Sequence, residues 1–236
     1  MSRLKNTFIL LLFLVSGNVF AQENLIKIGF SDAFLGNYNF NFERVLNDKN
    51  SVQLKVGYWA PTSSVFISEA TITPDPFELQ EASGGLSTSL EYRFYVTSQS
   101  APYGFYVAPY FRFFNQTAVF TDEIDGHYFD VDGQLNSFGV GGQIGYQFIF
   151  NETITVDLYF FGAGIDRHGA KFKYTLQEPQ PGFDYNSITD DVSEVFEDIN
   201  YFEKRLKHEV NDDNLTSKLP FLFPGFRLGV NVGIAF

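Results

Sequence analysis

The chain of 236 residues contains no cysteine, so it lacks a thiol nucleophile, a disulfide framework, a cysteine-ligated metal site and a lipidated cysteine. Basic residues are scarce as well. The 16 Lys and Arg against 28 Asp and Glu give a formal net charge of −12 at pH 7. Nucleic acids and anionic lipid head groups both attract basic surfaces. We therefore expect no nucleic acid partner, and composition also argues against binding to anionic head groups.

Long apolar runs are nearly absent. The run Phe8 to Val15 follows Arg3 and Lys5, and a small-residue cleavage site ends at Ala21. A membrane-spanning helix needs about 20 apolar residues, which argues against an N-terminal anchor. We interpret residues 1–21 as a secretory signal peptide and expect the mature chain to start at Gln22.

What the chain has in abundance is aromatic residues, with Phe, Tyr and Trp making up 18% of the sequence. They are interleaved with polar residues, and from Gln22 onward the dominant pattern is alternation, which places two sets of residues on the two faces of a strand. The segment Phe226 to Phe236 shows it best, with a large apolar residue at every second position. The same rule predicts strands in eight segments in all: 26–31, 37–43, 52–59, 87–94, 105–113, 137–148, 154–160 and 226–236.

The connections between these strands alternate in length. Short turns are predicted at 46–51, 97–103 and 150–153, and long loops at about 61–84, 118–135 and 167–217, with one short loop at 33–36. Outer-membrane barrels have an even strand number, both termini and short turns in the periplasm, and long loops outside. We therefore predict an all-β fold: one domain, 22–236, forming an eight-stranded antiparallel up-and-down transmembrane β-barrel of the outer membrane, with both termini periplasmic.

Charged residues indicate which face of the strands is which. All of those in the predicted strands fall on the less apolar face, and each Lys or Arg facing lipid near the midplane would cost about 2–4 kcal/mol. An eight-stranded barrel is just wide enough for side chains to fill it. We expect a filled lumen with a polar network rather than a pore, formed by Lys27, Glu43, Lys55, Glu91, Arg93, Arg112, Asp157 and Arg227.

A soluble, lipocalin-like ligand-binding barrel would accommodate the same charges in water, and this alternative stays open. Aromatic placement favours the membrane, because a ring of aromatics on the apolar face at the short-turn end is typical of a membrane interface. The predicted interface aromatics are Phe94, Phe105, Phe148 and Phe236. The terminal Phe236 also resembles the C-terminal signal of outer-membrane barrels, so we expect outer-membrane lipid and the barrel insertion machinery as partners.

The runs Glu91 to Tyr95 and Gly104 to Arg112, with the terminal Phe236, resemble an uncharacterised family of small Gram-negative outer-membrane β-barrel proteins, a domain of unknown function. The resemblance covers most of the mature chain. It implies the barrel fold and supplies no activity, catalytic residue or cofactor.

An embedded enzyme is the second alternative, since some small outer-membrane barrels modify lipid A with a serine nucleophile and a histidine base. His127, His168 and His208 all fall in predicted outer loops, and no serine stands at a spacing that predicts a dyad. We expect no catalytic residue and no cofactor. The carboxylates from Asp122 to Asp132 match only part of a calcium-loop pattern, so we predict no metal site either.

The outer loops are acidic, and the longest contains a helical pattern. Apolar residues recur at three and four positions, which predicts a short helix whose stripe must be buried: Val192, Val195, Phe196, Ile199, Phe202 and Leu206. Like charges crowded together should attract cations or a basic surface partner. We expect a monomer that acts through these acidic loops in binding, adhesion or envelope integrity.

Overall fold

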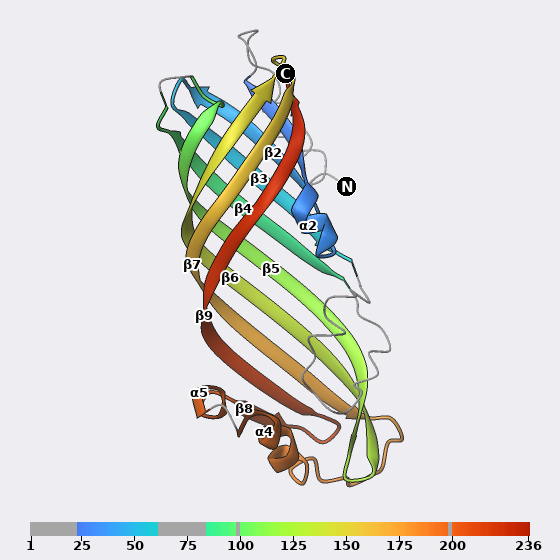
Figure 1. The fold of residues 1–236 in the computed structure, drawn as a ribbon. Helices are drawn as coiled ribbons and strands as arrows, with labels where there is room; N and C mark the ends of the chain where they lie inside the picture. Colours follow the sequence, from blue (N-terminus) through green and yellow to red (C-terminus); the bar gives the residue numbers. More distant parts are fainter. Residues whose placement is uncertain (1–22, 61–83, 98–99, 198–199) are drawn as a thin grey trace, which may run out of the picture.

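The computed structural model describes residues 23–60, 84–97, 100–197 and 200–236. The predicted signal peptide and nearly all of the predicted loop at 61–84 lie outside these ranges. Within them the chain is mostly antiparallel β-structure, as predicted (Figure 1). No helix in the described ranges is both long and apolar enough to cross a membrane.

The described strands number nine and form one sheet. Their bounds are β1 Asn24–Gly29, β2 Asn37–Asn47, β3 Asn50–Trp59, β4 Gly85–Tyr95, β5 Gly104–Ile124, β6 His127–Phe150, β7 Ile154–Leu176, β8 Lys207–Val210 and β9 Leu215–Ala235. Three short helices accompany them: α2 Phe30–Phe34, α4 Thr189–Glu197 and α5 Asn200–Glu203. We did not predict β8, whose four residues are too few to show an alternation, or α2, which covers the end of the strand predicted at 26–31 and the start of the short loop predicted at 33–36.

The sheet curls into a ring because β1 pairs with both β2 and β9. The order around the ring is β1 to β7 and then β9, while β8 pairs with β9 alone. β1 covers only one end of β9, with Leu25 opposite Ala235 and Gly29 opposite Asn231. The ring is therefore complete only toward the end that carries the C-terminus and the short turns.

Toward the other end, β5, β6, β7 and β9 continue well beyond the first four strands (Figure 1). These strands have 21 to 24 residues, whereas β1 to β4 have 6 to 11. The predicted loops at 118–135 and 167–217 were therefore wrong in extent. Residues 118–124 and 127–135 form a hairpin of β5 and β6, 167–176 belong to β7, and 215–217 to β9.

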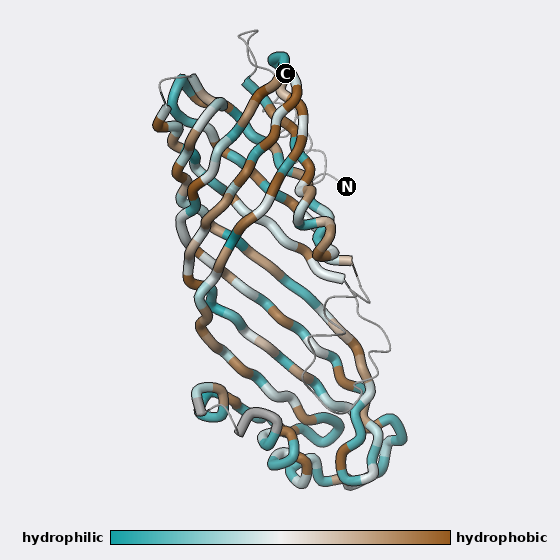
Figure 2. Tube along the Cα trace, viewed as in Figure 1, coloured by the Kyte–Doolittle hydropathy of each residue, from teal (hydrophilic) through white to brown (hydrophobic). Residues whose placement is uncertain are grey.

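The reason for this error is an inversion of the two faces along the long strands, in which hydrophilic and hydrophobic residues are interleaved (Figure 2). On β6, the outward side chains of Phe138 and Val140 are apolar and 52% and 60% exposed. Further along the same strand, Asp132 points outward, and Phe129 and Val131 point inward and are fully buried. Alternation persists, but the apolar set moves from the outer face to the inner one.

The inversion occurs at one level across the sheet. Phe113, Phe138, Arg167 and Leu222 are successive partners on β5, β6, β7 and β9. We call this level the boundary, the part on the side of the short turns the ring half, and the part beyond it the extension. The strands predicted at 105–113 and 137–148 end at this boundary, because the apolar residues beyond it lie on the opposite face.

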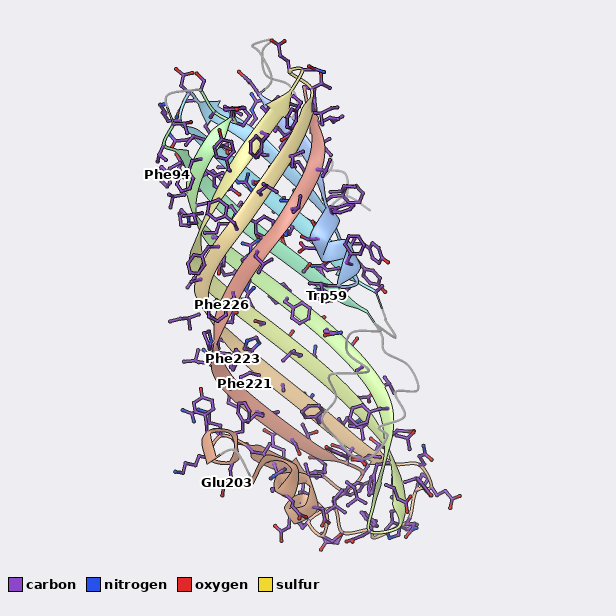
Figure 3. The ribbon with its side chains drawn as sticks, viewed as in Figure 1. Trp59, Phe94, Glu203, Phe221, Phe223 and Phe226 are labelled. Carbon is purple, nitrogen blue, oxygen red and sulfur yellow. The ribbon has the colours of Figure 1, made fainter. Side chains whose placement is uncertain are left out.

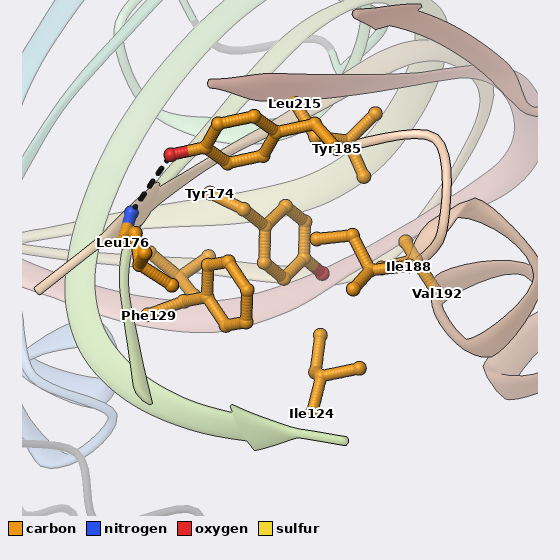
Figure 4. Packing of buried hydrophobic residues seen from close by; sticks show 9 residues of the cluster. Ile124, Phe129, Tyr174, Leu176, Tyr185, Ile188, Val192 and Leu215 are labelled. Atoms are coloured by element: carbon orange, nitrogen blue, oxygen red, sulfur yellow. Dashed lines mark hydrogen bonds between the residues drawn. The ribbon is translucent and has the colours of Figure 1, made fainter. Parts of the chain in front are cut away.

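The extension has its own apolar core (Figure 4). Tyr185, Ile188 and Val192, from the connection between β7 and β8, pack against strand residues, and the Leu176 backbone N–H donates to the Tyr185 hydroxyl at 3.2 Å. The strand residues of the cluster are Ile124, Phe129, Val131, Tyr174, Leu176 and Leu215. The predicted helix is present as α4, and its apolar stripe is buried on its own sheet at Val192. The side chains of Val195, Phe196 and Ile199 lie outside the description.

Close packing inside the ring half predicts a strict size limit at Gly145 of β6. A Cβ there would come within 2.5 Å of the Tyr106 ring and 2.6 Å of the Leu158 carbonyl oxygen, whereas a Cβ at Gly142 meets nothing within 4 Å. We expect Gly145→Ala to lower the free energy of unfolding by about 1–3 kcal/mol, because overpacking forces neighbours apart. Gly142→Ala is the matched control and should change it by less than about 0.5 kcal/mol. Urea unfolding of the two variants, followed by tryptophan fluorescence, compares them, and equal midpoints would contradict the packing described.

Candidate functional site

The ring half is filled by charged side chains that contact one another across its interior. Lys27 of β1 is fully buried, and its Nζ donates to Glu43 Oε2 at 2.6 Å, to Gln147 Oε1 at 2.8 Å and to Asp157 Oδ2 at 3.0 Å. These partners come from β2, β6 and β7. One ammonium group thus joins strands that are far apart around the ring.

Arg93 of β4 is the second centre of this cluster and is also fully buried. Its Nη2 lies 2.9 Å from both Glu91 Oε2 and Asp157 Oδ2, and its Nη1 lies 3.4 Å from Glu43 Oε2. The guanidinium group stacks on the Tyr106 ring at 4.3 Å. A rigid fork of donors suits such shared binding to several carboxylates.

Two tyrosines complete the hydrogen bonding. Tyr95 donates to Glu43 at 2.7 Å, and Tyr106 donates to Asp157 at 2.8 Å. With Arg227, which lies 3.1 Å from the second oxygen of Glu91, three cations meet three carboxylates. We call Lys27, Glu43, Glu91, Arg93, Asp157 and Arg227 the charged cluster.

Strand register aligns part of the cluster. Glu43, Gln53 and Glu91 are successive partners across β2, β3 and β4, and Gln147, which accepts from Lys27, is the direct partner of Asp157 in the β6–β7 ladder. Alternation then points all of them inward. The cluster therefore follows from the ladder together with the narrow bore, which brings opposite walls into contact.

A second level of ion pairs lies nearer the boundary. Lys55 Nζ donates to Asp32 Oδ2 at 2.7 Å, and the guanidinium group of Arg112 pairs with the carboxylate of Asp166. The alternation predicted Lys55 and Arg112 as members of the polar network, but it did not predict their partners Asp32 and Asp166. Asp32 belongs to α2, where no strand pattern exists, and Asp166 follows a bulge in β7 between Tyr159 and Gly162 that breaks the alternation.

All eight residues of the predicted polar network point into the ring, at these two levels. The four predicted interface aromatics lie on its outer face. Phe94 and Phe236 are exposed there, and Phe105 and Phe148 are half-buried beside neighbouring rings, Phe160 and Phe150 respectively.

A cavity of about 420 Å³ lies between the second level of ion pairs and the boundary. Its polar lining includes Asp32, Lys55, Ser89, Arg112, His168 and Arg227, and its apolar lining includes Leu35, Trp59, Phe226 and Leu228. Its volume falls within the range of about 300–1,000 Å³ typical of small-molecule sites. We regard the cavity as the candidate binding site.

The three histidines belong to strands rather than to loops, and one contacts two serines. His208 Nε2 lies 3.0 Å from Ser193 Oγ, and His208 Nδ1 lies 2.9 Å from Ser217 Oγ. The sequence pattern did not predict this contact, because the folding of β8 and α4 brings the residues together.

The contact between Ser193 and His208 does not have the geometry of a catalytic pair. Ser193 Oγ donates to the Thr189 carbonyl at 2.8 Å, so its proton is not directed at the imidazole as nucleophilic catalysis requires. Burial lowers the pKa of His208, which keeps it neutral at pH 7. The arrangement holds α4 against β8 and β9.

Other chemistry has little support in the described part of the chain. No three His, Cys, Asp or Glu side chains gather there in a group that could hold a metal ion. No protein-family model, curated protein or solved structure matches the sequence. The resemblance to small outer-membrane barrel proteins therefore stays a prediction from the motifs quoted above.

We predict that the charged cluster is required for stability. Arg93→Met leaves Glu91 and Asp157 buried with fewer cations, and removing one partner of a buried ion pair costs about 3–5 kcal/mol. Lys218→Met is the control, because Lys218 and Glu209 form an ion pair whose side chains are 43% and 60% exposed. An exposed pair contributes about 0–1 kcal/mol. Urea midpoints of the two variants measure the difference, and an unchanged midpoint for Arg93→Met would show that the cluster is not closed to water.

Proposed function

We propose that the ring half is an eight-stranded transmembrane β-barrel of the outer membrane, with β8 as an added outer strand, and that the protein is a non-conducting binding protein. The observation that carries this proposal is the inversion of faces at the boundary. Lipid requires an apolar outer face, and water requires a polar one. A single chain that changes from the first to the second at one level matches the passage from lipid to water.

The outer face of the ring half is apolar on strand after strand. Large side chains that are 45–67% exposed there include Phe40, Leu54, Val56, Leu90, Val140 and Ile154. Removing a large apolar side chain from water contributes about 1.5–3 kcal/mol, so a continuous belt of this kind favours insertion in lipid. The lipocalin-like alternative requires the opposite arrangement, with apolar residues inside the ring, where the charged cluster lies.

Short turns of outer-membrane barrels lie on the periplasmic side, so we place the extension outside the cell, and charge placement supports a membrane surface at the boundary. Arg167, Lys204, Arg205 and Lys207 line a pocket of about 320 Å³ at the boundary with no acidic residue among its lining. The outward Glu123, Asp130 and Asp132 lie far from the boundary, near the tip of the β5–β6 hairpin. Basic groups beside a membrane surface attract anionic head groups. Composition alone argued against such contacts, because the basic residues are few, but the fold gathers four of them.

The proposed function therefore has a membrane part and an outer part. The charged cluster closes the bore on the side of the short turns, and the cavity and the extension face the cell exterior. Binding at the outer side fits this arrangement better than passage through the bore. The lipid A enzyme alternative gains little from His208, because Ser193 donates its proton to the Thr189 carbonyl and Ser217, the other serine in contact with the imidazole, is fully buried.

Single cysteines test the topology, because the native chain has no thiol that would react. We expect a membrane-impermeant maleimide to label Lys171→Cys, in the extension, on intact cells. Asp48→Cys, in the β2–β3 turn, should react only after the envelope is permeabilised. Val140→Cys should resist labelling in both cases, because lipid covers it, although its side chain is 60% exposed in the isolated protein. Rapid labelling of Val140→Cys would show that the belt faces water and would favour the soluble alternative.

The closed bore predicts no ion conductance. Purified protein in planar bilayers should give current no larger than the bilayer alone, because the cluster residues fill the cross-section of an eight-stranded ring. Stable ohmic openings of the wild-type protein would contradict the proposal. Opening events seen only in Arg93→Met would support it, since that change removes the largest fully buried side chain of the cluster.

A further inference from the structure

The wall of the ring is incomplete beside one edge of β9. β1 pairs with residues 231–235 of this strand and β8 with residues 215–218. Between them, in the part of the chain that the structure describes, no strand pairs with the side of β9 that faces away from β7. Among the described residues, helices hydrogen-bond to this edge at two points: Ser31 Oγ accepts from the Val230 N–H at 2.9 Å, and the Tyr201 hydroxyl contacts the Leu222 backbone.

The cavity reaches this edge. Leu35, at the end of α2, lines it on one side, and Phe226 and Leu228 of β9 line it on the other. The side chains of Phe226 and Leu228 are 70% and 75% exposed and lie within the apolar belt. Figure 3 shows Phe226 on β9 and Trp59 near the end of β3, and both residues line the cavity. The mouth of the cavity is thus apolar and faces sideways, toward the layer where we place lipid.

The lining of the cavity carries polar atoms without partners. Ser89 Oγ and Arg227 Nη1, on the side of the ion pairs, are buried and have no hydrogen-bond partner, and the same holds for His168 Nδ1 at the boundary. Ser89 is 4% exposed, and the side chain of Arg227 is 8% exposed. Buried donors are almost always paired in folded proteins, because an unpaired one loses its hydration without compensation. All three atoms belong to residues that line the cavity.

The unpaired donors of the lining define the chemistry of the missing partner. Each cation of the lining already has a carboxylate, since Lys55 pairs with Asp32, Arg112 with Asp166 and Arg227 with Glu91. Arg227 Nη1 and Ser89 Oγ are the buried donors that lack a partner. A guanidinium donor beside a hydroxyl donor suits an anionic oxygen acceptor. An apolar mouth that opens sideways suits a hydrocarbon chain.

We infer that this cavity binds the head group of a long-chain carboxylate, whose hydrocarbon chain leaves through the opening between α2 and β9 into the outer leaflet. Arg227 Nη1 and Ser89 Oγ donate to the carboxylate. The chain passes Leu35 on one side and Phe226 and Leu228 on the other. This inference rests on the proposed membrane position of the ring half, and it names the ligand class for the binding function.

Palmitate is the probe, measured as saturable binding to the full-length protein in lipid nanodiscs above that of protein-free nanodiscs. Hexadecanol has the same chain without the carboxylate, and acetate has the carboxylate without the chain. We expect palmitate to bind at least about tenfold more tightly than hexadecanol, because a charge-assisted hydrogen bond to Arg227 is lost in the alcohol. We expect acetate and inorganic phosphate not to displace palmitate.

Ser89→Ala tests the site without disturbing an existing contact, because Ser89 Oγ has no partner in the unliganded protein. Palmitate affinity should fall by about fivefold to tenfold, with unchanged urea midpoint. Thr155→Val is the matched control: its hydroxyl is also buried without a partner, but Thr155 does not line the cavity.

A second pair of variants tests the apolar mouth of the cavity. Leu35→Gln should weaken palmitate binding, because Leu35 lines the mouth, and Leu46→Gln, at the far end of β2, should not.

Equal affinity for palmitate and hexadecanol would overturn the inference, because the cavity would then not recognise the carboxylate. Displacement of palmitate by phosphate or acetate at similar concentrations would overturn it in favour of a free-anion site. An equal loss of palmitate affinity in Ser89→Ala and Thr155→Val would also overturn the inference. Failure of the proposed function looks different, since a water-soluble protein would not enter nanodiscs and would react with maleimide at Val140→Cys.

Discussion

The pairing of charges away from water is the constraint on which the rest of this structure depends. Lys27 and Arg93 are fully buried, and each contacts carboxylates from two or three strands. Leaving either cation unpaired would cost more than a typical hydrogen bond contributes. The ring must therefore close with its strands in one register, since a shift of one residue would turn every one of these side chains to the outer face. The cluster fixes register as well as filling space.

Much of this arrangement could be predicted from alternation, because period two assigns a face to every residue without knowledge of the fold. Lys27, Glu91 and Arg93 were placed together on that basis. Alternation has no information about residues outside strands or beyond a bulge, and so Asp32 and Asp166 were missed. The cavity was missed for a related reason. It exists because β1 ends at Gly29 while β9 continues, and the relative lengths of two paired strands are set by tertiary packing.

The extension shows why a hydropathy rule can fail while the strand continues. Val131 and Phe138 are both apolar residues of β6, seven positions apart, and they point to opposite faces. In the proposed membrane position both side chains leave water, because water then lies on a different side of the sheet at each level. A reversal of the apolar face within one unbroken alternation marks a change of solvent along a strand. In a sequence, such a reversal therefore indicates the position along a strand at which the surroundings of the sheet change.

The two prolines of β9 have a consequence for how this protein meets copies of itself. Pro220 and Pro224 stand opposite Gly169 and Ile165 of β7. Proline has no N–H, so within a sheet it is tolerated where its nitrogen faces a free edge. An unpaired strand edge is otherwise a template for adding a strand from another molecule. Between Leu219 and Phe226 an incoming strand would find two of the donors missing, and the ladder could not propagate. The edge can thus stay open in a crowded environment without nucleating a fibre.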